Sequence, residues 1–296
     1  MTDIHDFQGN ILCNTSSVLG EGPTYDPDTD TVWWFNILGK ELHALHLPTG
    51  KKQVHNLPMM ASVLARVDAE RQIIATEEGL FLRDIASGEL SFYAAIEADK
   101  PENRSNDGRT HISGSLWIGT MGKRAEMQAG AIYHVAAGGK VTKIFDQISI
   151  PNSICFSPDG TIGYYTDTRI SQLMRVLVDP ETGLPAGEPI VMVDSVEDPG
   201  GLDGSVCDAD GYIWNARWGS GFVDKYSPDG LRIERYRVPA MQPSCPAFIG
   251  KNADRLAVTT AWEGLDDEAR SMQPQAGALL ELGLTVRGVF DPPYKL

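Results

Sequence analysis

The chain has 296 residues and a formal net charge of −15, and its basic residues form no run, so neither nucleic acid nor an anionic membrane is expected as a partner. The length exceeds that of the usual single domain, although closed all-β folds reach it as one unit. Four widely separated cysteines without a C-x-x-C pair indicate neither a zinc knuckle nor a disulfide framework, and they favour reduced thiols in the cytoplasm.

The N-terminal segment MTDIHDFQGN is polar. It lacks the basic region and the apolar stretch of a signal peptide, and no apolar run in the chain approaches the roughly 18 residues that span a membrane. We therefore expect neither secretion by a standard signal peptide nor a membrane-spanning segment.

The segment DPDTDT, residues 26 to 31, places carboxylates at alternate positions, as a calcium-binding loop does. An EF-hand loop needs glycine at its sixth position and a bidentate glutamate at its twelfth. These positions hold Thr31 and Ile37, so the half of the motif that completes the coordination is missing. The alternative is a polar turn ahead of the apolar run VWWF, because Asp and Pro favour turns and aromatic and β-branched residues favour strands.

A polar turn followed by an apolar strand recurs along the chain. The copies are DPDTDTVWWFNI (26 to 37), DAERQIIATEE (68 to 78), ISGSLWIGTM (112 to 121), SPDGTIGYYTDT (157 to 168), DADGYIWNARW (208 to 218) and KNADRLAVTTAW (251 to 262). Subtraction gives steps of 41, 43, 46, 51 and 43 residues between the aligned strand starts Val32, Ile73, Leu116, Ile162, Ile213 and Leu256. A further strand and a glycine turn follow each copy, so each repeat holds several strands.

A period of about 40 to 50 residues with four short strands is typical of a propeller blade. We therefore predict an all-β fold, a six-bladed β-propeller that forms one domain over residues 1–296. The segment before Glu21 is expected to complete the last blade, and DPDTDT is expected to be a turn of the first. The tryptophans are expected to serve mainly as blade packing, while Trp218 and Trp262, near strand ends, could wall a sugar pocket.

In a propeller, a fixed offset from the repeat anchor marks one ring around the axis. The residues ten before the anchors, or eleven before Val32, are Glu21, Val63, Asn106, Asn152, Asp203 and Pro246. Four of these six positions carry a carboxylate or carboxamide, in glycine- and proline-rich contexts typical of the entry to an inner strand. The alternative is that they are ordinary turn residues, since Asn-Asp-Gly and Asp-Gly are common turn sequences.

Such a ring would gather carboxylate and amide oxygens at one mouth of the central channel, where a cation would relieve their repulsion. Hard oxygen ligands suit calcium, magnesium or manganese better than copper, and zinc is also possible. Three or four protein ligands would leave positions for water or substrate, as in a catalytic site. The sequence therefore predicts a central site for a divalent cation.

Several segments spread over the whole chain resemble one family, that of senescence marker protein 30 (regucalcin), gluconolactonase and luciferin-regenerating enzyme. They are LGEGPTYD, NRSNDGRTHISGSLWIGTM, IPNSICFS, DGSVCDADGYIW and QPQAGALLEL. The resemblance implies that one divalent cation is bound by Glu21, Asn152 and Asp203, positions that the offset argument had also selected.

The resemblance further implies that the substrate is a sugar lactone, held by Arg104, Asn106 and Asp107. Hydrolysis of a lactone needs a polarised carbonyl, an activated water and a place for the developing oxyanion, and a divalent cation can supply the first and third. We expect Asp203 to be the base that activates the water, with Arg104 and Asn106 orienting the substrate oxygens. Asp107 is either a hydroxyl acceptor or the aspartate of an Asp-Gly turn.

Three features depart from the pattern of this family. Ser153 stands where glycine usually follows the asparagine, and His111 and Ile112 replace an Asp-Pro after the NDG segment. Lys123 occupies a position that is acidic in some members. These differences bear on the choice of substrate, and a cation at Lys123 would favour a lactone that carries a carboxylate.

Two other functions stay open at this point. Propellers that hydrolyse aryl esters or organophosphates resemble this one, although they usually carry more metal ligands, and a non-catalytic calcium-binding propeller is the other alternative. No histidine lies beside a serine or cysteine in the manner of a nucleophilic triad. We expect a cytoplasmic enzyme, monomeric or weakly homo-oligomeric, that acts on a small-molecule sugar lactone.

Overall fold

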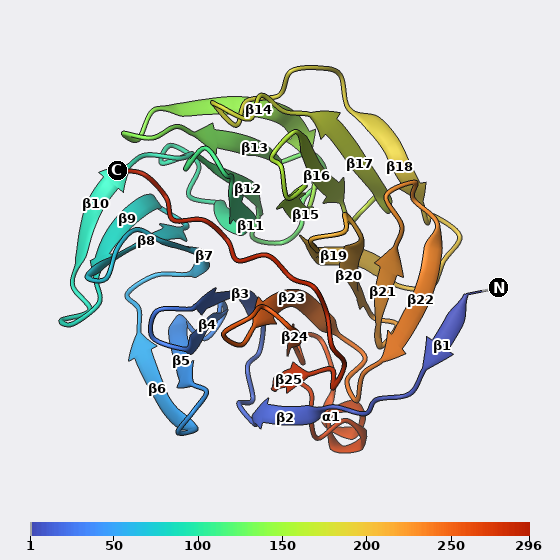
Figure 1. The fold of residues 1–296 in the computed structure, drawn as a ribbon. Helices are drawn as coiled ribbons and strands as arrows, with labels where there is room; N and C mark the ends of the chain where they lie inside the picture. Colours follow the sequence, from blue (N-terminus) through green and yellow to red (C-terminus); the bar gives the residue numbers. More distant parts are fainter. Residues whose placement is uncertain (1) are drawn as a thin grey trace.

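Six β-sheets follow one another around a central axis in this computed structural model, which describes residues 2–296 (Figure 1). Consecutive strands within each sheet pair antiparallel from the axis outward, because short runs of β-branched and aromatic residues alternate with glycine and aspartate turns. The arrangement confirms the predicted six-bladed β-propeller.

Each blade of the described chain runs from an innermost strand at the axis to an outer strand (Figure 1). The innermost strands are β3 (Gly20–Asp26), β7 (Ala61–Arg66), β11 (Asn103–Thr110), β15 (Pro151–Phe156), β19 (Gly201–Cys207) and β23 (Pro243–Ile249). The second strands, which carry the repeat anchors, are β4 (Thr31–Asn36), β8 (Arg71–Thr76), β12 (Leu116–Gly122), β16 (Ile162–Asp167), β20 (Ile213–Trp218) and β24 (Arg255–Thr260).

The third and outer strands complete the blades. The third strands are β5 (Glu41–His46), β9 (Gly79–Asp84), β13 (Gly130–Val135), β17 (Gln172–Leu177), β21 (Phe222–Tyr226) and β25 (Leu279–Glu281). The outer strands are β6 (Lys51–Asn56), β10 (Leu90–Ala94), β14 (Val141–Ile148), β18 (Ile190–Asp194), β22 (Arg232–Arg237) and β2 (Asn10–Cys13).

The N-terminal segment closes the ring. Strand β2 pairs antiparallel with β25, with Asn10 opposite Glu281, which confirms that the segment before Glu21 completes the last blade. Strand β1 (Asp3–His5) instead pairs parallel with β22 and adds a fifth strand to the neighbouring blade (Figure 1). The sequence did not predict this second attachment, because three residues carry no periodic signal.

Apolar side chains fill the spaces between neighbouring blades. Each of six buried clusters within residues 2–296 draws mainly on two adjacent blades; Val63 of the second blade, for example, belongs to the same cluster as Leu116 of the third. Trp34, Trp117 and Trp214, all on second strands, are fully buried. This confirms the expected role of these tryptophans in packing the blades.

The DPDTDT segment forms the turn between β3 and β4. Asp26 accepts hydrogen bonds from the backbone N–H of Asp28 at 3.1 Å and from the hydroxyl of Thr29 at 2.7 Å. Asp30 accepts from the hydroxyl of Tyr25 at 2.6 Å. Two of the three carboxylates are therefore engaged within the turn, which confirms the turn interpretation over the calcium loop.

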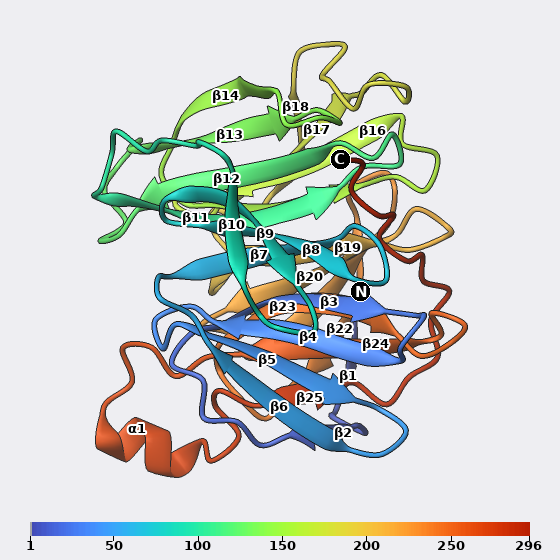
Figure 2. The same ribbon diagram turned by 90° about the vertical axis from the view of Figure 1, so that its left-hand side faces the viewer.

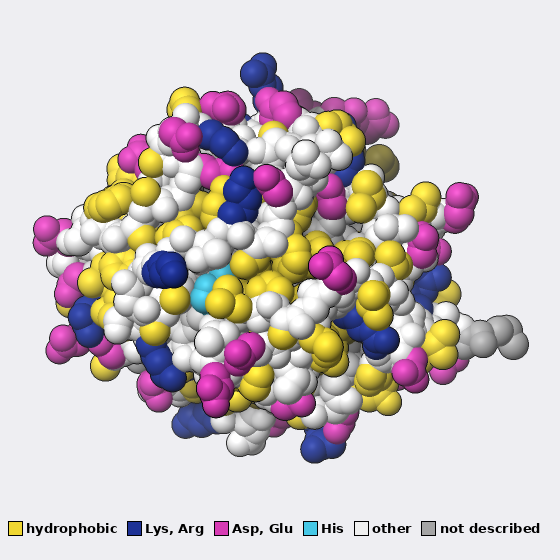
Figure 3. Space-filling view, turned by 90° about the horizontal axis from the view of Figure 1, so that it is seen from above, with side chains coloured by type: hydrophobic (Ala, Val, Ile, Leu, Met, Phe, Trp, Pro, Cys, Tyr) yellow, Lys and Arg dark blue, Asp and Glu magenta, His cyan; other side chains and the backbone are white. Residues whose placement is uncertain are grey.

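The two faces of the ring differ. Helix α1 (Asp267–Met272) extends from one face, and the C-terminal segment, residues 283–296, crosses the axis on the other (Figures 1 and 2). Among residues 2–296, no helix has the length and apolar character that crossing a bilayer requires. A view onto the edge of the ring shows acidic and basic side chains interspersed around an area of hydrophobic ones (Figure 3).

Candidate functional site

A shift in strand register occurs in each innermost strand of the described chain, at the level of the predicted ring. The shifts lie between Glu21 and Thr24, Ala61 and Val63, Ser105 and Gly108, Asn152 and Cys155, Leu202 and Ser205, and Pro243 and Pro246. Bulges of this kind bend a strand and re-aim its side chains, and they are common beside active sites. At a bulge, neighbouring polar side chains can both point toward the channel. Strict alternation would point every second one to the opposite face of the sheet.

The predicted residues meet in a cavity of about 330 Å³ at one mouth of the channel. Its wall includes Glu21, Arg104, Asn106, Lys123, Asn152 and Asp203. Glu263, which lies just before α1, also lines the cavity and places it on the α1 side of the ring (Figure 2). Trp218 belongs to the wall as well, whereas Trp262 donates its Nε1–H to the carbonyl of Ser16.

Two buried carboxylates lie together at this mouth. Glu21 is 7% exposed and Asp203 is 4% exposed. Burial, followed by repulsion from Asp107, raises the pKa of Glu21 to about 8. Burial and then the charge of Glu21 raise the pKa of Asp203 well above its usual value. Holding both groups in their charged form out of water would therefore be costly unless a positive charge compensated them.

The donor set at this position fits a hard divalent cation. Glu21 and Asp203 offer carboxylate oxygens, and Asn152, 4% exposed, offers a carboxamide oxygen. Among residues 2–296, no group of three His, Cys, Asp or Glu side chains is placed to hold a metal, so the amide would be needed as the third donor. Two charged oxygens and one neutral oxygen suit calcium, magnesium or manganese.

A chain of hydrogen bonds orients the carboxamide of Asn152. Its Oδ1 accepts from Nδ2 of Asn106 at 2.9 Å, and its Nδ2 donates to the hydroxyl of Thr168 at 2.8 Å. Asn106 in turn accepts from Nη1 of Arg104 at 2.7 Å. Because the nitrogen of Asn152 is engaged by Thr168, its oxygen is kept on the side of Asn106.

Arg104 lines the cavity and is 7% exposed. Its Nη1 also donates to the carbonyl of Ser105 at 2.9 Å, while its buried Nε has no hydrogen-bond partner among the described residues. A buried donor left unpaired costs about 1–3 kcal/mol. The place of Arg104 in the cavity wall is compatible with its expected role, and its contact with substrate stays a prediction.

The carboxylate of Asp107 is bound by backbone N–H groups of two blades. Its Oδ1 accepts from the N–H of Gly108 at 2.8 Å, and its Oδ2 accepts from the N–H of Ile154 at 2.8 Å. Burial raises its pKa to about 6, against the opposing charge of Arg109. With both oxygens engaged by amides of two blades, Asp107 is placed to hold β11 against β15, and its contact with substrate stays a prediction.

The side chain of Lys123 reaches the cavity wall but is paired there. Its Nζ lies 2.5 Å from Oε2 of Glu77 and donates to the carbonyl of Pro101 at 2.7 Å. Glu77 comes from the second blade and Lys123 from the third, so the pair also joins two blades. Part of the charge that Lys123 could offer a substrate is therefore neutralised by Glu77.

Ser153 connects β15, which carries Asn152, with β19, which carries Asp203. Its φ of +57° lies in the left-handed region, which glycine adopts without strain and serine does not. Its hydroxyl donates to the backbone carbonyl of Asp203 at 2.5 Å and accepts from Ser205 and Asn215 at 3.1 Å each. The serine that replaces the usual glycine thus ties the residue after Asn152 to the backbone of Asp203.

We expect the variants Ser153→Gly and Ser153→Ala to differ in stability. Both lose the hydroxyl contacts, at about 1 kcal/mol, but alanine keeps the left-handed strain that glycine removes, which is worth about 1–2 kcal/mol. In urea unfolding, the parent and Ser153→Gly should therefore show a higher free energy of unfolding than Ser153→Ala. An alanine variant as stable as the glycine variant would show that the backbone here is not strained.

The sequence did not indicate three polar residues of the cavity wall, which are Arg124, Thr168 and Glu263. Each follows the end of a second strand, and antiparallel pairing places that end beside the start of the innermost strand, where the ring lies. Polar residues just after the second strands would therefore have been the signal to look for.

Comparison with known proteins places the chain among related sequences. The family model for the SMP-30/gluconolactonase/LRE-like region matches residues 19–262. A crystal structure of a calcium-binding protein, regucalcin, from Agrobacterium tumefaciens strain C58 is 58% identical, with 100% of both chains covered and a TM-score of 0.99. A pentonolactonase of Haloferax volcanii is 33% identical over 94% of both chains. An L-arabinolactonase of Azospirillum brasilense is 32% identical, covering 94% of this chain and 93% of the relative.

Proposed function

The chain belongs to the SMP-30/gluconolactonase/LRE-like family, and from this premise we propose that it is a lactonase, which hydrolyses a sugar lactone to the open-chain sugar acid with a divalent cation bound. The observation that carries the proposal is the pair of buried carboxylates, Glu21 and Asp203, beside the side chains of Arg104 and Asn106 in one cavity. Two relatives, 33% and 32% identical to this chain, are named as lactonases that act on sugar lactones.

The cation would be held by Glu21, Asn152 and Asp203. When bound, it would polarise the lactone carbonyl and stabilise the negative charge that develops on the carbonyl oxygen. Calcium is the first choice, because the donors are hard oxygens and the similar regucalcin structure is that of a calcium-binding protein. Zinc, manganese and magnesium are the alternatives to compare.

The residues of the chain supply the remaining steps. Arg104 and Asn106 hold the ring oxygen and hydroxyls so that the lactone carbonyl faces the two carboxylates. Asp203 takes a proton from water as the water oxygen bonds to the carbonyl carbon. The ring C–O bond then breaks, and the proton passes from Asp203 to the departing ring oxygen, which becomes the new hydroxyl of the sugar acid.

Proton release from a panel of aldonolactones and uronic-acid lactones tests the proposed function. Metal-stripped protein should be inactive and should regain activity with calcium or another divalent ion. The variant Glu21→Gln removes one charged donor and should bind the cation more weakly, whereas Glu78→Gln, on an exposed turn, should behave as the parent does.

The same experiment separates the alternatives. Turnover of aryl esters or phosphotriesters above that of every lactone would favour the ester-hydrolysing propellers. Tight binding of the cation without turnover of any of these substrates would favour a non-catalytic binding protein. Either result would overturn the lactonase proposal.

The charge of Lys123 is expected to influence the choice between neutral and acidic lactones. Replacement by methionine should lower kcat/KM for a uronic-acid lactone relative to a neutral one, and Glu77→Gln, which frees Lys123, should shift the ratio the other way. Because Lys123 is one-third exposed, each shift should be no more than about fivefold. Equal ratios in the parent and both variants would show that residue 123 does not sense substrate charge.

A further inference from the structure

The cavity on the α1 side has one aromatic residue in its wall. Within residues 2–296, Trp218 is the single aromatic side chain that lines this cavity of about 330 Å³. Trp218 is the last residue of β20 and pairs with Gly201 of β19. Asp203 follows two residues further along β19. The same pair of strands therefore carries the indole and one of the two buried carboxylates.

The ring of Trp218 has no stacking partner in the described chain. Each of the other five tryptophans has another ring or a cation packed against it. The pairs are Trp33 with His55, Trp34 with His43, Trp117 with Phe145 and Phe156, Trp214 with Tyr236, and Trp262 with Arg270. The first four of these tryptophans are buried, whereas Trp218 is half-buried. Trp218 thus combines a place in the cavity wall with a ring that the fold leaves unpaired.

Alternation along β20 decides where the indole points. Arg217, the preceding residue, is fully buried and donates to the hydroxyl of Ser195 and to the carbonyl of Gly200, both at 2.9 Å. Because neighbouring side chains of a strand point to opposite faces, Trp218 points the other way and packs on the buried cluster that includes Leu19. Leu19 lines the cavity as well. The two side chains therefore form an apolar part of the wall.

Side chains that can hydrogen-bond to a sugar lie on other blades. Arg104 and Asn106 belong to β11 of the third blade, and Asn152 belongs to β15 of the fourth. A sugar ring carries its hydroxyls around the edge and C–H groups on its faces, and an aromatic ring offers a large, flat apolar surface to such a face. The wall thus provides polar groups for the edge of a ring and an indole for its face.

We propose that Trp218 is the residue on which the sugar ring packs, with the C–H face of the lactone against the indole, so that the site selects cyclic molecules over open-chain ones. This inference rests on the proposed function, since it takes a sugar lactone as the occupant of the cavity. Hydrolysis opens the ring and removes its rigid face. The sugar acid therefore keeps less contact with Trp218 than the lactone has.

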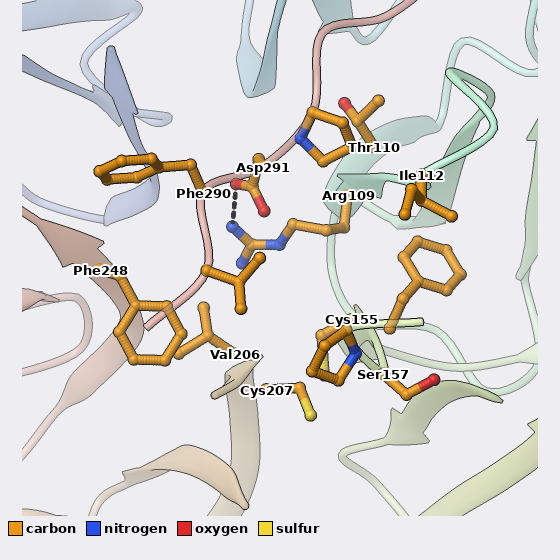
Figure 4. Close-up of a pocket in the computed structure, with 14 residues that line it drawn as sticks. Arg109, Thr110, Ile112, Cys155, Ser157, Val206, Cys207, Phe248, Phe290 and Asp291 are labelled. Carbon is orange, nitrogen blue, oxygen red and sulfur yellow. Dashed lines mark hydrogen bonds and ion pairs between the residues drawn. The ribbon is translucent and has the colours of Figure 1, made fainter. Parts of the chain in front are cut away.

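The other mouth of the channel differs in this respect. A second cavity, of about 240 Å³, lies there beneath the C-terminal segment (Figure 4). Its wall includes Phe248, Phe290 and the ion pair of Arg109 with Asp291, in which Nη1 of the arginine lies 2.8 Å from Oδ2 of the aspartate. No tryptophan of the described chain lines this cavity. A change in tryptophan fluorescence on binding therefore reports on the α1 side of the channel.

An analogue that resists hydrolysis tests the contact without turnover. D-gluconolactam keeps the ring and the carbonyl of a sugar lactone but has an amide in place of the ester, and D-gluconamide carries the amide and the hydroxyls on an open chain. With a divalent cation present, the lactam should change the tryptophan fluorescence saturably and bind about threefold to tenfold more tightly than D-gluconamide. Equal affinities, or no saturable change at about 20 mM lactam, would overturn the proposal.

Two replacements of tryptophan by phenylalanine locate the contact. Trp218→Phe keeps a flat ring, so calorimetry should show lactam binding within about threefold of the parent, while the fluorescence change should be lost. The matched control is Trp262→Phe, at a tryptophan of the next blade that lies outside the cavity wall and under Arg270, and it should keep the fluorescence change. A change that persists in Trp218→Phe would show that the lactam does not pack on this residue.

Steady-state kinetics on the lactones provide a second readout. Trp218→Ala should raise KM about threefold to tenfold with kcat within about twofold of the parent, because the contact is made equally in the ground state and in the transition state. Trp218→Phe should restore KM. The increase should be the same for neutral and acidic lactones, and a loss in kcat with unchanged KM would contradict the proposed contact. If the parent hydrolyses no lactone, the proposed function fails, whereas the lactam titration still decides whether a sugar ring packs on Trp218.

Discussion

Replacement of Asp203 by asparagine is expected to lower kcat/KM for lactone hydrolysis by about 10³-fold. Asparagine has the same shape but cannot accept the proton of the attacking water. The backbone position should persist, because the carbonyl of residue 203 accepts hydrogen bonds from Ser153 and Asn215 that do not involve the side chain. Steady-state kinetics with the cation at saturating concentration measure the loss.

A second readout separates lost chemistry from lost structure. Without a cation, burial and the proximity of Glu21 disfavour the charged form of Asp203, so Asp203→Asn, which is neutral, should leave the metal-free protein at least as stable as the parent in thermal unfolding. An inactive variant with an unchanged or raised Tm would support the role of the base. Activity within about tenfold of the parent would remove Asp203 from that role.

Removal of the Asp224 carboxylate by Asp224→Ala is expected to lower the free energy of unfolding by about 3–5 kcal/mol. Asp224 on β21 is fully buried and accepts from Nε of Arg235 at 2.7 Å and from its Nη2 at 3.2 Å. Arg217, also fully buried, has its Nε 3.9 Å from the same carboxylate. The variant would leave these guanidinium groups in the fifth blade without their counter-ion, which is more costly than losing an attraction.

A matched ion pair on the surface provides the control for Asp224. Asp210 lies 2.6 Å from Arg287, but the two side chains are 41% and 73% exposed. Asp210→Ala should therefore change the free energy of unfolding by less than about 1 kcal/mol, although this contact is slightly shorter than that between Asp224 and Arg235. Urea unfolding of both variants measures the difference, and similar losses would contradict the view that burial, rather than distance, decides the effect.

Much of the fold could be predicted because it is encoded locally. Each blade is a run of consecutive strands, so the polar turn and apolar strand recur about every 40 to 50 residues, and this period is visible without any knowledge of contacts. The polar ring could be predicted for the same reason, since equal offsets from the repeat anchors such as Ile162 and Ile213 mark equal positions in the blades. The position of the segment before Glu21 followed from the need to complete a sixth blade.

The details of the candidate site were less accessible. Alternation along a strand would send neighbouring side chains to opposite faces, and the sequence contains no simple signal for the bulges that bring Asn106 and Asp203 to the channel. The engagement of Asp107 with the amide of Ile154, and of Lys123 with Glu77, depends on contacts between blades. Such contacts involve residues that no periodic pattern relates.

The sequence by itself therefore determined the number of blades, the closure by the N-terminal segment and the set of polar residues at one mouth of the channel, because these follow from local periodicity and composition. Only the tertiary structure decided which of those residues face the cavity, which charges are already paired, and that the C-terminal segment covers a second cavity. The ion pair of Arg109 with Asp291 joins parts of the chain 182 positions apart. Contacts over such separations arise from the packing of the closed ring, where burial and the pairing of charges select one arrangement.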